Sequence, residues 1–173
     1  MGYGIIRVNG KTLTLLSMGV INLSNLENQA LKLKKIFEKT LTLLDDYTPD
    51  ELAIEAPFFG KNVQSMLKLG RAQGVAMAAG LYRDVPIFEY SPKTIKQSIT
   101  GNGSASKEQV AAMLQTILGY EEQPSYLDAS DGLAAAVCHY FQGGKVDGLP
   151  KAKGGSKGSW KAFIDANPGR LSQ

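Results

Sequence analysis

A two-residue turn signal between two β-rich runs is the feature that most constrains how this chain can fold. The runs, 2–8 and 11–23, are rich in Ile, Val, Leu, Tyr and Thr, and only Asn9-Gly10 separates them. Both residues of an Asn-Gly pair tolerate a positive φ, which the tight turn of a two-residue hairpin requires. The sequence therefore predicts an antiparallel hairpin at its start.

Helical and strand patterns alternate after the hairpin. Apolar spacing, turn residues and helix caps mark each predicted element. In order, these are a helix over 28–44, a strand over 51–56, a helix over 63–82, a strand over 85–90, a short helix from Ser91-Pro92, a helix from the capping box Ser106/Gln109 to about Leu118, and a helix over 126–142. A hairpin followed by this order predicts an α/β fold, with helices packed on the faces of a mixed sheet.

Size and composition fit one folded domain. The 173 residues are 43% hydrophobic and 20% charged, which argues against a disordered chain. No apolar run reaches the roughly 18 residues of a membrane-spanning helix, and no secretory signal is visible. The single cysteine, Cys138, and the single histidine, His139, argue against a disulfide framework and a zinc site. We therefore expect a cytoplasmic protein without a membrane partner.

Positive charge is concentrated near the C-terminus. Residues 143–173 hold six basic and two acidic side chains, a net charge of +4, whereas residues 1–142 hold 13 basic and 14 acidic ones, a net charge of −1. This asymmetry predicts a folded domain over 1–142 and a basic Gly/Lys-rich tail over 143–173. The tail either keeps the protein in solution, the interpretation we favour, or weakly attracts phosphates.

Three carboxylates are candidates for metal chemistry. Glu55 ends a predicted strand, at the edge where ligands gather in sheets with helical crossovers, although an acid there can simply meet water. Asp128 and Asp131 are three residues apart on a helix, and Asp131 falls on its apolar stripe, where a carboxylate is costly to bury without a cation. Asp128 also suits a helix-capping role. Together the three fit Mg²⁺ or Mn²⁺.

Two lysines and an aromatic residue are candidates for binding nucleic acid. Lys96 and Lys107 flank a Gly-Asn-Gly loop, and Lys107 lies in the first turn of a helix, where the dipole disfavours a cation. An anion held by free N–H groups of the loop and helix start would explain it, whereas a solvated lysine is the plainer alternative. Phe58 is either a core residue or a stacking platform for an unpaired base.

Small residues crowd the predicted helix over 63–82. Gly70 and Gly74 each weaken a helix by roughly 1 kcal/mol relative to alanine. The compensation would be the close approach of another helix, either from within the chain or from a second subunit.

Seven segments carry a resemblance to a known family. They are Glu51-Leu-Ala-Ile-Glu55, Phe58-Phe-Gly-Lys61-Asn62, Leu67-Lys-Leu-Gly70-Arg-Ala-Gln-Gly74-Val-Ala, Pro86-Ile-Phe-Glu-Tyr90, Ile95-Lys96-Gln97, Thr100-Gly-Asn-Gly-Ser-Ala-Ser-Lys107 through Val110, and Asp128-Ala-Ser-Asp131-Gly-Leu-Ala. In collinear order they closely resemble the bacterial RuvC family of crossover-junction (Holliday junction) endodeoxyribonucleases. The resemblance extends from Gly2 to about His139.

The resemblance implies an RNase H-like fold, a homodimer, and Mg²⁺-dependent hydrolysis of opposed strands in a four-way DNA junction during recombination and repair. It implies two divalent cations per subunit and a branch-migration helicase complex as partner. Glu55, Asp128 and Asp131 match the family's metal-binding acids. Phe58 matches an aromatic that contacts junction bases, and Lys96 and Lys107 match phosphate-contacting lysines.

The chain departs from the family at its start. The family's first strand, a central one, and its first metal-binding aspartate come before the Gly-Tyr-Gly matched by 2–4, so both are expected to be absent here. We favour a misassigned or truncated start over a working minimal enzyme. The alternative function is a junction-binding protein whose catalysis is impaired.

Overall fold

The computed structural model describes residues 1–57, 62–120 and 129–143. Its elements, in chain order, are β1 (Gly2–Asn9), β2 (Thr12–Val20), α1 (Gln29–Tyr47), β3 (Leu52–Glu55), α2 (Val63–Tyr82), β4 (Ile87–Tyr90), α3 (Pro92–Thr100), α4 (Lys107–Leu118) and α5 (Ala129–Gln142). The predicted elements are thus present in the predicted order. Residues 126–128 of the last predicted helix, and the predicted tail beyond Gly143, lie outside the described residues.

The N-terminal hairpin is confirmed, but its turn lies one residue later than predicted. Asn9 still pairs with Thr12, so Gly10 and Lys11 form the two-residue loop. Gly10 has a φ of 60°, whereas Lys11 does not have a positive φ. A positive φ at the first loop position alone is the pattern of a type II′ turn, for which glycine is the preferred residue.

The strands form two separate pairs in the described part of the chain. β1 and β2 are antiparallel, and β3 and β4 are parallel. No described strand joins one pair to the other. The α/β class is therefore confirmed.

Element boundaries differ from the prediction by a few residues. α1 continues to Tyr47, three residues past the expected end, and stops at Thr48 with a φ of 42°. The residue before a proline is disfavoured in the helical region, so Pro49 explains why α1 ends at this point. β3 and β4 are shorter than predicted because only four residues of each strand form ladder pairs.

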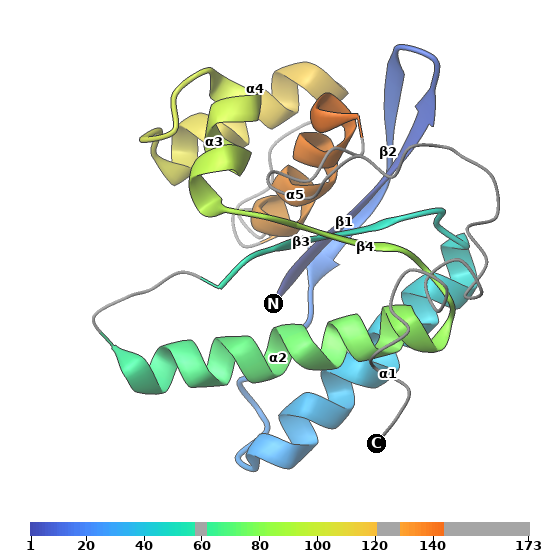
Figure 1. The fold of residues 1–173 in the computed structure, drawn as a ribbon, viewed down its shortest axis with the longest axis vertical. Coiled ribbons are helices and arrows are strands. Elements are labelled where there is room, and N and C mark those ends of the chain that lie inside the picture. Colours follow the sequence, from blue (N-terminus) through green and yellow to red (C-terminus); the bar gives the residue numbers. More distant parts are fainter. Residues whose placement is uncertain (58–61, 121–128, 144–173) are drawn as a thin grey trace, which may run out of the picture.

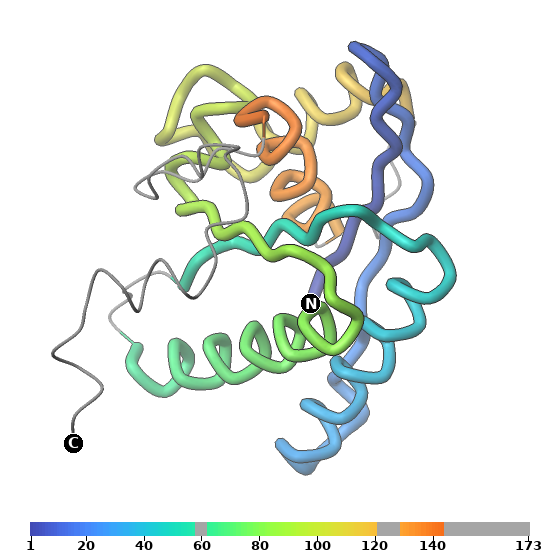
Figure 2. The backbone as a smooth tube through the Cα atoms, turned by 45° about the vertical axis from the view of Figure 1, so that its right-hand side comes forward, coloured from blue at the N-terminus to red at the C-terminus, as the bar shows by residue number. Residues whose placement is uncertain are grey.

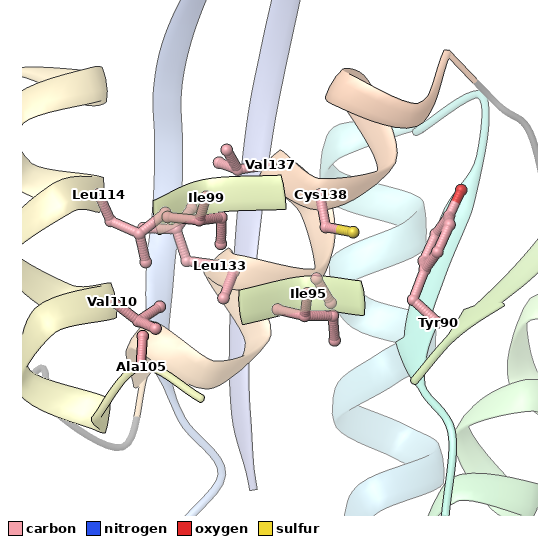
Figure 3. Close-up of a cluster of buried hydrophobic side chains, with 11 residues drawn as sticks. Tyr90, Ile95, Ile99, Ala105, Val110, Leu114, Leu133, Val137 and Cys138 are labelled. Carbon is pink, nitrogen blue, oxygen red and sulfur yellow. The ribbon is translucent and has the colours of Figure 1, made fainter. Parts of the chain in front are cut away.

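Helices lie on both sides of the strands (Figure 1). α1 and α2 lie on one side of β3 and β4, and α3, α4 and α5 lie on the other. The same arrangement is visible when the molecule is turned by 45° (Figure 2). The larger core is centred on α5, whose Leu133, Val137 and Cys138 are fully buried among residues of α3 and α4 (Figure 3). A smaller core joins α1 to α2 through Leu44 and Ala79.

Within residues 1–57, 62–120 and 129–143, no helix is both long and apolar enough to cross a membrane.

Candidate active site

Glu55 lies at the carboxyl end of β3, where the sequence predicted it. It pairs in parallel register with Tyr90, the last residue of β4. The next residue, Ala56, donates its N–H to the Tyr90 carbonyl at 2.8 Å. The backbone on both sides of Glu55 is therefore fixed, while its side chain is partly exposed at the edge of the strand pair.

Gln73 holds the backbone of Glu55 from the opposite side. The Gln73 side-chain amide, on α2, donates a hydrogen bond to the Glu55 carbonyl oxygen. Gln73 is 8% exposed, and its Oε1 atom has no partner among the described residues. Sequence reasoning missed this contact, because a glutamine among the small residues of α2 carries no pattern that identifies a partner in β3.

Two glycines bring the start of α5 against β1 and so place Asp131. A Cβ atom on Gly132 would lie 2.5 Å from the Tyr3 Cα, and a Cβ on Gly4 would lie 2.5 Å from the Leu133 Cα. Only residues without a side chain permit two backbones to approach this closely. Asp131 immediately precedes Gly132, so this packing fixes the position of its backbone.

The spacing of Asp131 along the helix predicts that it is buried on the apolar stripe of α5. This prediction is wrong, because the Asp131 side chain is 54% exposed. Phe141, an apolar residue near the other end of α5, is also largely exposed, at 48%. Helical spacing alone therefore overestimates the burial of both residues.

Lys107 faces Asp131 across the starts of two helices. The Lys107 ammonium nitrogen lies 3.0 Å from Asp131 Oδ2. Lys107 is the first residue of α4, whose start is fixed by the confirmed capping box between Ser106 and Gln109. A carboxylate therefore offsets the unfavourable position of a cation at a helix N-terminus.

The charged side chains influence the ionisation of Glu55. Partial burial raises the pKa of the Glu55 carboxyl group above its ordinary value of 4.5, and the negative charge of Asp131 raises it further. The positive charges of Lys96, on α3, and Lys107 lower the pKa of the same group. Three of the other predicted site residues, Asp131, Lys96 and Lys107, thus lie close enough to Glu55 to affect its ionisation.

The other two predicted site residues, Phe58 and Asp128, lie outside the described residues. Within the described segments, no three His, Cys, Asp or Glu side chains are grouped so that they could hold a metal ion. Glu55 and Asp131 supply the hard oxygen ligands that Mg²⁺ and Mn²⁺ prefer.

The Gly-Asn-Gly loop does not offer the free N–H groups that the sequence suggested. The Gly103 N–H donates to Gln97 Oε1 at 2.9 Å, and the Ser104 N–H donates to Asn102 Oδ1 at 3.0 Å. The loop therefore satisfies these donors internally and holds α3 and α4 in a fixed relation. Any anion at this edge would be attracted by the lysine side chains instead.

Comparisons with known proteins identify relatives of this chain. Residues 1–139 match the family described as crossover junction endodeoxyribonuclease RuvC. A protein of that name from Cytophaga hutchinsonii is 60% identical over 99% of this chain and 82% of its own length. One from Porphyromonas gingivalis is 58% identical over 99% of this chain and 90% of its own length.

Two solved structures are similar in fold. Thermus thermophilus RuvC has a TM-score of 0.73 and 33% sequence identity, and covers 82% of this chain and 87% of its own. T. thermophilus RuvC in complex with a Holliday junction substrate has a TM-score of 0.75, with the same identity and coverage.

Proposed function

Because the chain belongs to the RuvC family of crossover junction endodeoxyribonucleases, we propose that it cuts four-way DNA junctions by metal-dependent phosphodiester hydrolysis at the edge formed by Glu55 and Asp131. The observation that supports this site most directly is the convergence of residues from four elements. Glu55 comes from β3. The three charged side chains that influence its ionisation come from three helices: Lys96 from α3, Lys107 from α4 and Asp131 from α5.

Members of a nuclease family of this kind depend on a divalent cation, and Glu55 and Asp131 suit that role. Partial burial and then the negative charge of Asp131 raise the pKa of Glu55, so both oppose its ionisation. A hard cation between the two carboxylates would remove their repulsion. We propose Mg²⁺, with Mn²⁺ as a substitute, two ions per subunit, and Asp128 as a further ligand. When bound, such ions polarise a phosphate and lower the pKa of a water molecule.

The lysines would bind and orient the DNA backbone. Lys107 lies beside Asp131, so a phosphate held by its ammonium group would lie next to the carboxylates. Lys96 is partly exposed on α3 and contributes positive charge at the same edge. Both lysines also favour the ionised form of Glu55, which is the form that can bind a cation. We propose Phe58 as the aromatic residue that contacts junction bases.

We also propose a homodimer that uses an exposed stripe of α2. Leu67, Leu81 and the intervening Gly74 are exposed on this helix. A Cβ atom on Gly70 or Gly74 would meet nothing within 4 Å, so packing inside the described chain does not explain either glycine. A second copy of α2 approaching at this stripe explains both. It would also supply two sites, one for each opposed strand of a junction.

A junction-binding protein without cleavage is not favoured by the comparisons, because the relatives described above are named endodeoxyribonucleases. The branch-migration helicase partner and the cytoplasmic location stay predictions from the sequence.

A synthetic four-way junction tests the proposed function. The chain should nick it in Mg²⁺ and should leave a linear duplex of the same sequence intact. Glu55→Gln should abolish nicking while junction binding in EDTA stays within about twofold of the parent, because the substitution removes a ligand charge at an exposed position. Junction binding without any nicking by the parent chain in Mg²⁺ or Mn²⁺ would contradict the proposed activity.

A further inference from the structure

The single histidine of the chain links α5 to the start of β3 and to β4. His139 Nε2 lies 2.6 Å from Glu51 Oε2, and His139 Nδ1 lies 2.6 Å from the Tyr90 hydroxyl oxygen. Glu51 immediately precedes β3, and Tyr90 is the ladder partner of Glu55 at the other end of that strand. One imidazole ring thus connects a helix to the residue before β3 and, through the Tyr90 hydroxyl, to the strand that pairs with β3.

This chain of hydrogen bonds is shielded from water over most of its length. Tyr90 is 2% exposed and the His139 side chain is 12% exposed. The Phe88 ring covers the imidazole, with ring centroids 4.5 Å apart. Figure 3 shows Tyr90 beside Cys138, the neighbour of His139 on α5. Hydrogen bonds in such surroundings are stronger than at an exposed surface, so they restrict movement of α5 along β3.

The spacing along α5 matches the spacing along β3. Eight residues separate Asp131 from His139, which corresponds to about 12 Å at the rise of an α-helix. Four residues separate Glu51 from Glu55, which corresponds to about 13 Å along a strand. When His139 pairs with Glu51 at one end, Asp131 therefore comes level with Glu55 at the other.

We propose that Glu51, His139 and Tyr90 are positioning residues that fix the register of α5 along β3 and so hold Asp131 opposite Glu55. A slide of α5 by one helical turn, about 5.4 Å, would separate the two carboxylates by more than a shared cation can span. The consequence for metal binding rests on the proposed function, whereas the register itself does not. None of the three residues needs to touch DNA or metal.

A distance measurement without metal or DNA tests the register. Nitroxide labels at two exposed positions, Glu89→Cys on β4 and Phe141→Cys on α5, report the separation of the two elements in a Cys138→Ala background. His139→Phe keeps a ring against Phe88 but removes both hydrogen bonds. It should shift or broaden the distance distribution. Glu51→Ala, at a side chain 45% exposed, provides a second variant with little risk to folding.

Calorimetric titration with Mn²⁺ alone tests the consequence for the two acids. His139→Phe and Glu51→Ala should each weaken Mn²⁺ binding by roughly tenfold, the range seen when a residue that orients a metal ligand is removed. Tyr90→Phe should also weaken Mn²⁺ binding, because it removes the hydrogen bond between the Tyr90 hydroxyl and His139. Tyr140→Phe is the matched control, because its hydroxyl lies 3.4 Å from the Lys11 carbonyl oxygen and does not reach β3. It should leave Mn²⁺ binding unchanged.

The outcomes separate the two claims. An unchanged distance distribution in both His139→Phe and Glu51→Ala would overturn the register proposal, even if the parent chain cuts junctions. A changed distribution with unaltered Mn²⁺ affinity would overturn the positioning role, because the acids would then be held by other contacts. A parent chain that neither binds Mn²⁺ nor nicks a junction would instead contradict the proposed function, while the distance measurement would still decide the register.

Discussion

The Lys107 ammonium group lies 3.0 Å from the Asp131 carboxylate, although 24 residues separate the two in the sequence. The pair brings the start of α4 to the start of α5 and leaves both side chains partly exposed, at 40% and 54%. An exposed ion pair of this kind contributes little to stability. Its position at the edge that carries Glu55 is therefore better explained by binding than by folding.

Lys107→Ala should weaken junction binding by about three- to tenfold and reduce the slope of log affinity against log salt by about one, because one phosphate contact is lost. Fluorescence anisotropy at several salt concentrations in EDTA measures both quantities. Lys35→Ala, at an exposed lysine of α1, is the control and should change neither. Equal effects of the two substitutions would mean that Lys107 adds only general charge.

Glu55→Gln should stabilise the metal-free protein at neutral pH. The pKa of Glu55 is raised in the folded state, so ionisation of this group opposes folding as pH rises through the raised value. The gain should be below about 1 kcal/mol, since the side chain is exposed and solvent screens the repulsion. Thermal unfolding should show this gain at pH 7 and lose it below the ordinary value of 4.5. A destabilised variant at pH 7 would contradict the raised pKa.

Gly132→Ala should destabilise the protein by about 1–3 kcal/mol, because the added Cβ would meet the Tyr3 backbone at 2.5 Å. Chemical denaturation measures the loss. Gly119 makes no such contact but has a φ of 65°, so it is a poor control. Ala136→Gly, one turn further along α5, isolates the helix-propensity effect from the packing effect. A variant as stable as the parent would show that α5 and β1 are less tightly packed.

Gly74→Leu should weaken self-association without lowering the helix content of the subunit. Open space surrounds Gly74, so the larger side chain fits the isolated chain but would obstruct a second copy of α2. Sedimentation velocity over a concentration series measures the change. Lys35→Leu on α1 adds a similar apolar group away from the stripe and should leave association unchanged. A parent chain that is monomeric at all concentrations would contradict the proposed dimer.

The order of the elements could be predicted because most signals were local. The Ser91-Pro92 helix start and the Ser106/Gln109 capping box each depend on residues within one helical turn, and the structure confirms both caps. The hairpin turn was misplaced by one residue, because Asn-Gly can occupy either of two registers and the cross-strand pairing decides between them.

The site was predicted as residue types but not as an arrangement. Glu55 and Asp131 were identified from their positions in β3 and α5, whereas the contact between Lys107 and Asp131 depends on how α4 meets α5. The roles of Gln73 and His139 could not be predicted for the same reason. Their partners lie far away in the sequence, and no short-range pattern distinguishes a buried polar residue that supports a site from one that supports the core.

The central claim is that Glu55 and Asp131 act together on the DNA phosphate. Single-turnover nicking of a synthetic four-way junction in Mg²⁺ by Glu55→Gln, Asp131→Asn and the double variant tests it most directly. Because both carboxylates would serve the same cations, each single variant should lose nearly all cleavage and the double variant should lose no more than the worse of the two, with junction binding in EDTA retained throughout. Substantial cleavage by either single variant would contradict the claim.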